Sequence, residues 1–199
     1  MAITATMVKE LREATGAGIL EVKKALEAAD GNFDKAADIL REKGAARAAK
    51  RADRQANEGV IQMYSHPGGR VGVMVEINCE TDFVARNEQF QQLAFEIALQ
   101  IAALSPKYVA REEVDAAELE RELDVLRAQA KAEGKPDNIV EKIVEGRIAK
   151  FYEEFCLMEQ GFIKDDKRKV KDVIAGVIST TGENIVVRRF ARYELGEAL

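Results

Sequence analysis

The stretch Asn78-Cys79-Glu80-Thr81-Asp82-Phe83-Val84-Ala85-Arg86-Asn87 separates two segments with different hydrophobic periods. Before it, every second residue is apolar, as on the buried face of a strand: Val71, Val73, Val75, Ile77 and Cys79. After it, apolar residues recur every three or four positions, as on one face of a helix: Phe90, Leu93, Ala94, Ile97, Ile101 and Leu104. The sequence therefore predicts a strand-to-helix junction at residues 78–87.

Phe83 is the residue of this junction that ordinary core packing explains poorly, because a strand-to-helix junction faces solvent. One interpretation of the junction is structural, with Thr81 or Asp82 as the cap of the following helix. The other is functional, with Phe83 as an apolar wedge on a rigid mount and the Asp82 carboxylate beside it, ready to enter a pocket of a partner. The residues alone leave both interpretations open.

Length, charge and cysteine content limit the class of protein. A chain of 199 residues can bury a core, but its Gly and Pro pattern favours small modules over one large domain. A net charge of −5 argues against non-specific binding to nucleic acid. Two cysteines without paired spacing, Cys79 and Cys156, indicate a reducing compartment. Early charged residues argue against a signal peptide, and no stretch is apolar enough to span a bilayer, so we expect a cytoplasmic protein.

Three short helices are predicted at the N-terminus. Thr4 is the expected N-cap of the first helix and Gly16 its end. Asn32 is the expected N-cap of the third helix and Gly44 its end. Between them, apolar residues at helical spacing predict the second helix: Ile19, Val22, Leu26 and Ala29. A bundle of this size is too small for a catalytic cleft, so we expect it to serve in docking.

A basic segment follows the bundle, with four cations on one helical face: Arg47, Lys50, Arg51 and Arg54. One interpretation is a stripe that contacts the phosphates of RNA, and the other is a solvated connecting helix. We favour the connecting helix, because no aromatic residue lies between the charges to stack on bases.

A β-hairpin is predicted next, from Val60 to Tyr64 and from Arg70 to Cys79, with the only histidine, His66, near its turn. A Cys-His-Asp nucleophile system of Cys79, His66 and Asp82 fails on distance, since the strand places about 30 Å between thiol and imidazole at roughly 3.3 Å per residue. The scarcity of Cys and His also excludes a zinc site. No GxxxxGK[ST] or GxGxxG motif occurs, so we expect no cofactor, no metal and no enzymatic activity.

Two further helices are predicted to form an antiparallel hairpin. Asp115 is the expected N-cap of the first, whose apolar residues lie along one seam: Leu119, Leu123, Leu126 and Ala130. Gly134-Lys135-Pro136 reverses the chain into the second, whose apolar residues run from Ile139 to Phe155. A structural role, a dimer contact and a second docking arm remain open for this hairpin, and we favour the first two.

The chain ends with a helix and a strand. Apolar spacing predicts the helix at Val170 to Val177 and one face of the strand at Ile185, Val187, Ala191, Tyr193 and Leu195. Three strands and two covering helices make a small α+β module. Such a sheet leaves strand edges that proteins usually pair or cover.

Four segments in order along nearly the whole chain resemble the elongation factor Ts family, the guanine nucleotide exchange factors for elongation factor Tu: TGAGILEVKKALEAADGNFDKA, NCETDFVARN, GKPDNIVEKIVEGRIAKF and RYELGE. The resemblance implies an α+β fold in three parts. Residues 1–55 would form a ubiquitin-associated-like three-helix domain plus a basic linker helix. Residues 56–108 and 162–199 would form the α+β core, the dimerisation domain, and residues 109–161 an inserted coiled-coil hairpin.

The resemblance also implies how the protein acts. The family's TDFV element corresponds to Thr81, Asp82, Phe83 and Val84. In that mechanism Phe83 enters a crevice of elongation factor Tu in its GDP-bound form, and Asp82 disturbs the groups that hold Mg²⁺ there, so that GDP leaves without any chemistry by the factor.

Docking and assembly follow from the same resemblance. Met7, Val22 and Lys23 are candidate docking residues in the N-terminal bundle, although Val22 is equally explained as core. This chain carries one sheet module where longer family members carry two, so it is similar to the short form, in which a homodimer supplies the second module. We therefore expect a two-to-two complex with elongation factor Tu. The alternatives are an RNA-binding protein that uses Arg47 to Arg54 and a thiol hydrolase at Cys79.

Overall fold

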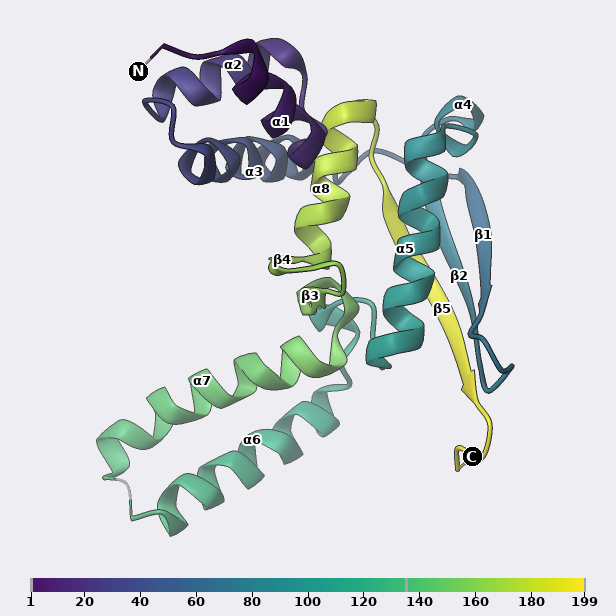
Figure 1. Cartoon of the computed structure of the whole chain (residues 1–199). Coiled ribbons are helices and arrows are strands. Elements are labelled where there is room, and N and C mark those ends of the chain that lie inside the picture. Colours follow the sequence, from purple (N-terminus) through teal and green to yellow (C-terminus); the bar gives the residue numbers. More distant parts are fainter. Residues whose placement is uncertain (1, 135, 199) are drawn as a thin grey trace. The chain divides into compact units, whose positions relative to one another are not determined.

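A computed structural model describes residues 2–134 and 136–198 (Figure 1). It has the predicted α+β class, in which helices accompany a small antiparallel three-stranded sheet. The chain forms two compact units: one comprises the residues up to Leu99 and from Lys171 onward, and the other Gln100–Val170. The finer division at residues 1–55, 56–108 with 162–199, and 109–161 stays a prediction.

The N-terminal bundle consists of three helices: α1 (Ala5–Thr15), α2 (Ile19–Ala28) and α3 (Phe33–Ala49). The predicted caps are present. The Thr4 side chain accepts a hydrogen bond from the N–H of Met7 at 3.2 Å, and the Asn32 side chain accepts one from the N–H of Lys35 at 2.9 Å. Gly16 ends α1 with φ 68°, a left-handed conformation that favours glycine.

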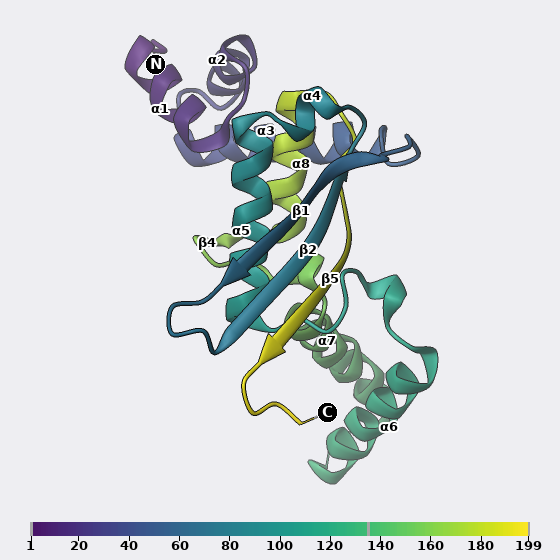
Figure 2. The ribbon, with the colours of Figure 1, turned by 90° about the vertical axis from the view of Figure 1, so that its right-hand side faces the viewer.

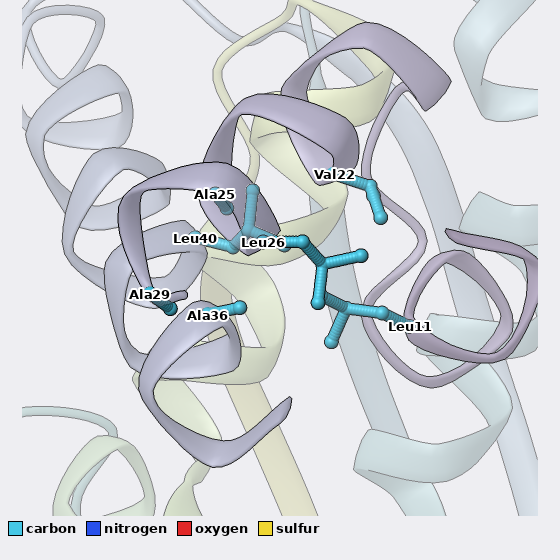
Figure 3. Close-up of a cluster of buried hydrophobic side chains, with 7 residues drawn as sticks. All are labelled: Leu11, Val22, Ala25, Leu26, Ala29, Ala36 and Leu40. Carbon is cyan, nitrogen blue, oxygen red and sulfur yellow. The ribbon is translucent and has the colours of Figure 1, made fainter. Parts of the chain in front are cut away.

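The core of the bundle comes from all three helices (Figure 3). Its buried members are Leu11, Val22, Ala25, Leu26, Ala29, Ala36 and Leu40. One predicted boundary is wrong: α3 does not end at Gly44 but continues to Ala49. Gly44 is buried, and a glycine costs only about 1 kcal/mol relative to alanine inside a helix, which packing can offset. The basic segment is thus helical as far as Ala49 and continuous with the third helix.

The three-stranded sheet has the antiparallel order β1 (Glu58–Ser65), β2 (Val71–Cys79) and β5 (Val186–Glu194). Two helices, α5 (Glu88–Leu104) and α8 (Val170–Thr181), lie on one face of this sheet (Figures 1 and 2). The buried apolar residues of these elements include Val73, Val75, Ile77, Phe90, Leu93, Ile97, Val173, Ile174 and Val187. The opposite face carries no covering helix within the described part of this unit (Figure 2).

A β-bulge changes the pattern of β5. Ile77 pairs with Val187, whereas Glu76 pairs with Arg189, so Arg188 is an extra residue between two ladder partners. An extra residue in a strand reverses which side chains face the core beyond it.

The predicted alternation of the last strand is therefore correct at Val187 and wrong beyond it. Phe190 is half-buried, whereas Ala191 is exposed and Tyr193 keeps 74% of its surface accessible. Leu195, just after the strand, is also exposed. These three residues were expected on the face of Val187. The bulge moves Ala191 and Tyr193 to the uncovered face of the sheet.

The second unit contains the predicted helical hairpin and short accessory elements: η1 (Arg111–Glu113), α6 (Ala116–Ala132), α7 (Asp137–Phe155), η2 (Leu157–Glu159), β3 (Gly161–Phe162) and β4 (Asp165–Lys169). The Asp115 carboxylate caps α6 by accepting hydrogen bonds from the N–H groups of Ala117 and Glu118. Helices α6 and α7 pack through buried Leu126, Ala130, Val140 and Val144. Lys135, within the predicted turn, lies outside the described residues. No helix in the described chain has the length and apolar character that a bilayer crossing requires.

Candidate functional site

The TDFV element forms the short helix α4 (Asp82–Ala85) between β2 and α5. Thr81 is its N-cap, and the Thr81 hydroxyl accepts a hydrogen bond from the N–H of Val84 at 3.4 Å. Thr81 is therefore a helix cap, as the structural interpretation held, but it caps the separate short helix α4 and not the amphipathic helix α5 (Glu88–Leu104) for which the cap was predicted. Ala85 at the end of α4 is buried, so the short helix is anchored through a small apolar side chain.

Phe83 is the most exposed of the large apolar side chains that the structure describes, with 82% of its surface accessible. Burying a phenylalanine is worth about 1.5–3 kcal/mol, and the fold forgoes this stabilisation here. The cap and the wedge are therefore compatible: Thr81 shapes α4, and α4 presents Phe83 to solvent.

The far end of α4 is held by polar contacts to the chain that follows. The side-chain amide of Gln91 donates to the carbonyl of Ala85 at 2.5 Å, and the Asn87 side chain accepts from the N–H of Gln89 at 2.8 Å. These bonds join α4 to the first turn of α5, so Phe83 projects from a fixed turn rather than from a long loop.

Asp82, beside the wedge, forms an ion pair with Arg86 at 2.9 Å, one helical turn further on. The Arg86 side chain is 80% exposed and that of Asp82 is 47% exposed. Solvent-exposed pairs of this kind contribute about 0–1 kcal/mol. The carboxylate can therefore exchange Arg86 for another partner at little cost.

Cys79 lies directly behind the junction and is fully buried. Its thiol donates to the carbonyl of Thr81 at 3.2 Å, and burial raises the pKa of Cys79 to about 11. A thiol in this state is protonated at neutral pH and is a poor nucleophile. The thiol hydrolase hypothesis thus loses its chemical support. Among the residues described, no three His, Cys, Asp or Glu side chains gather as a metal site would require.

The candidate docking residues of the bundle occupy different environments. Val22 is fully buried in the core, which is the alternative that the sequence left open for it. Met7 is half-buried against that core, whereas Lys23 is exposed and pairs with Glu27 at 3.9 Å. Of these three candidates, only Met7 and Lys23 are therefore accessible for docking.

Two exposed apolar residues next to Lys23 were missed by the sequence reasoning. Ile19 and Leu20, at the start of α2, are 55% and 75% exposed. A groove of about 920 Å³ runs beside Ile19, which lines it together with Ile3 and Val8. Helical spacing had placed Ile19 on the core face. The sequence did contain one sign of this exposed surface: Leu20 is a large apolar residue that lies outside the stripe predicted to be buried.

The arginines of the basic segment are engaged by groups of the protein itself. The Arg47 guanidinium hydrogen-bonds both carboxylate oxygens of Glu21, which lowers the pKa of Glu21, and it donates to Ser179 at 3.0 Å. Arg51 donates to the carbonyl of Gly182 at 2.9 Å. Phosphate contacts would have to compete with these bonds, which argues against an RNA-binding stripe. The predicted single helical face is wrong, however, because α3 ends at Ala49 and Lys50, Arg51 and Arg54 lie in the turns that follow it.

These features define a modular α+β protein that presents large apolar side chains to solvent on its junction helix, its bundle and its sheet. The family model described as Elongation factor TS matches residues 2–197. The chain is 60% identical over 197 residues to the elongation factor Ts of Desulforamulus reducens, covering 99% of this chain and 91% of that protein. It is 57% identical to the elongation factor Ts of Thermoanaerobacter sp. strain X514, covering 99% and 97%. The chain therefore belongs to the elongation factor Ts family, as the four sequence segments indicated.

Proposed function

We propose that this protein promotes GDP release from elongation factor Tu by inserting the TDFV element, Thr81 to Val84. The observation that carries the proposal is the 82% exposure of Phe83 on a short, capped helix. Family membership supports the coarser function, guanine nucleotide exchange on elongation factor Tu. The TDFV mechanism is the finer part of the proposal.

In this mechanism the partner holds the nucleotide and the factor changes its surroundings. Phe83 enters a crevice between helices of the nucleotide-binding domain, and Asp82 disturbs the groups that coordinate Mg²⁺. Because Mg²⁺ neutralises and orients the diphosphate, weaker coordination loosens GDP. Linkage requires that the factor and GDP weaken each other's binding to the same degree.

The energy available from the wedge limits its effect. Burying one phenylalanine supplies about 1.5–3 kcal/mol, which shifts nucleotide affinity by roughly tenfold to a hundredfold. A larger effect needs binding energy from other surfaces. Met7, Lys23, Ile19 and Leu20 of the bundle are the residues that we propose for this docking contact.

Replacing the ring tests the wedge directly. We expect Phe83→Ala to reduce the stimulated release of mant-GDP from elongation factor Tu by roughly tenfold to a hundredfold, the range that one phenylalanine can supply. Its unfolding midpoint should stay that of the wild type, because Phe83 contributes little to the core. Phe95→Ala is the matched control, since Phe95 is also partly exposed, on α5. Wild-type release with Phe83→Ala would remove the wedge from the mechanism.

We further propose that the protein is a homodimer that pairs the uncovered sheet faces of two copies. The apolar side chains on this face come from all three strands: Ile61, Met63, Met74, Ala191 and Tyr193. Met63 pairs with Met74, and Met74 pairs with Ala191, so they form one row across the sheet. A second copy would bury this row against its own. Such a dimer would bind two molecules of elongation factor Tu.

A further inference from the structure

Glu183, in the turn after α8, is bonded to the turn that carries Phe83, although 102 residues separate Glu183 from Thr81. One carboxylate oxygen of Glu183 accepts from the backbone N–H of Glu80 at 3.1 Å and from that of Thr81 at 3.0 Å. The other oxygen accepts from the Thr81 hydroxyl at 2.6 Å. Both oxygens of Glu183 are thus used on the two residues that precede α4.

The contact is reciprocal, because Glu80 reaches back to the turn of Glu183. The Glu80 carboxylate accepts from the backbone N–H of Asn184 at 2.6 Å and from Arg54 at 3.4 Å. Asn184 is 3% exposed, and its side-chain amide donates to the carbonyls of Ala52 and Arg54 at 3.3 and 2.8 Å. The carboxylates of Glu80 and Glu183 therefore hold three segments together by hydrogen bonds. These segments are the end of β2, the start of β5 and the chain after α3, and we call these contacts the lock.

The Thr81 hydroxyl connects this lock to the wedge. It donates to Glu183 and accepts from the N–H of Val84, so Glu183 sets the direction of the side chain that caps α4. A helix of four residues does not hold its own shape, since even longer isolated helices are marginal in water. The orientation of Phe83 therefore depends on contacts from outside α4.

We infer that Glu183 is a positioning residue for nucleotide exchange, acting through Thr81 to hold Phe83 in the orientation that the partner's crevice accepts. This inference rests on the proposed wedge function. A wedge fixed before contact loses little conformational freedom on insertion, so more of its burial energy reaches the partner. Glu183 acts at the insertion step and not in the docking of the bundle.

Position, rather than charge, is what Glu183 supplies. The amide oxygen of a glutamine can accept from both backbone N–H groups, and its NH₂ can donate to the Thr81 hydroxyl oxygen. We therefore expect Glu183→Gln to retain function and Glu183→Ala to lose it. Glu133→Ala is the matched control, because it removes a carboxylate with two hydrogen bonds, to Arg147, in the other unit.

The experiment measures mant-GDP release from elongation factor Tu over a range of factor concentrations, with the full chain. Glu183→Ala should lower the maximal rate by roughly tenfold, the effect of one lost oriented contact, while the half-saturating concentration changes by less than about twofold. Glu183→Gln and Glu133→Ala should follow the wild type. Hydrogen exchange adds a local readout: the amides of Glu80 and Thr81 should lose protection in Glu183→Ala only.

Two results would overturn the inference. One is a wild-type maximal rate in Glu183→Ala although the amides of Glu80 and Thr81 have lost protection. The other is a Glu183→Gln rate as low as that of Glu183→Ala, which would mean that charge matters. If Glu183→Ala fails to fold, Thr81→Val replaces it as the test of the inference. This variant removes only the hydroxyl that links Glu183 to α4, and it should lower the maximal rate. If Phe83→Ala releases GDP like the wild type, the wedge function itself fails, a result distinct from these.

Discussion

Phe83 and Cys79 lie four residues apart in the sequence, and their side chains differ in burial. Phe83 is left in solvent at a cost to stability, whereas Cys79 is fully buried behind the same junction. A buried thiol resists ionisation, because the thiolate would lose its hydration. The first residue is therefore available to a partner, and the second supports the turn from behind.

The buried thiol gives a prediction for stability against pH. The ordinary pKa of the cysteine thiol is 9.0, and burial raises that of Cys79 to about 11 in the folded state. A raised folded pKa means that the folded state holds the proton more tightly. The stability contributed by Cys79 is thus fully present below pH 9.0 and is lost as the pH rises through about 11.

Urea unfolding between about pH 8 and pH 11 measures this loss. The free energy of unfolding should decrease more steeply in the wild type than in Cys79→Ala. Cys156 is also buried with its pKa raised to about 11, so the variant keeps part of the dependence. Native protein near pH 8 should react slowly with a thiol reagent. Rapid labelling of Cys79 under those conditions would contradict its burial.

At the scale of the element, the pairing of β1 with β2 requires a glycine at residue 59. Gly59 has φ 144°, and a Cβ built there would lie 2.1 Å from the carbonyl oxygen of Ile77 and 2.7 Å from the Cα of Asn78. Both are backbone atoms of the neighbouring strand and cannot rotate away. The strand pairing therefore excludes any larger residue at this position.

We expect Gly59→Ala to lower the free energy of unfolding by about 3 kcal/mol or more, because it combines an unfavourable backbone conformation with a backbone clash. Gly72→Ala is the matched control. Gly72 lies in the adjacent strand, and a Cβ there meets no atom within 4 Å. Urea unfolding of the two variants beside the wild type makes the comparison. Equal stabilities for the two would show that β1 and β2 are not so closely paired.

Features that depend on a few neighbouring residues could be predicted from the sequence. The caps at Thr4, Asn32 and Asp115 are examples, because each is a bond between residues two or three positions apart. The exposure of Phe83 was also predictable, since it follows from the change of hydrophobic period at the junction.

Features that depend on distant contacts could not be predicted. The bulge at Arg188 exists only in the pairing of β5 with β2, so simple alternation placed Tyr193 on the wrong face. Gly44 suggested a helix end, but burial of the surrounding helix outweighs a weak propensity. Glu183 was missed for the same reason, because its role is defined by Thr81, 102 residues away.

At the scale of the whole molecule, the uncovered sheet face is the surface that we propose as the homodimer interface. Met63 and Tyr193 are 67% and 74% exposed there, although they lie on strands rather than on loops. A contiguous apolar face of this kind marks an interaction surface. The bulge at Arg188 contributes to it by turning Tyr193 outward. The bulge that makes the predicted alternation wrong therefore also contributes to the proposed dimer interface.

A charge placed in the centre of this face tests the homodimer. Met63→Glu puts a carboxylate in the row of Met74 and Ala191, where pairing of two copies would bury it without a partner. We expect the dissociation constant of the dimer to rise by roughly a hundredfold or more, since an unpaired buried charge costs about 3–5 kcal/mol. Sedimentation velocity over a range of concentrations measures it. Leu104→Glu, at a partly exposed position on α5 on the other face of the sheet, is the control and should remain dimeric. A monomeric wild type, or a Met63→Glu variant that dimerises as well as Leu104→Glu, would exclude this face as the interface.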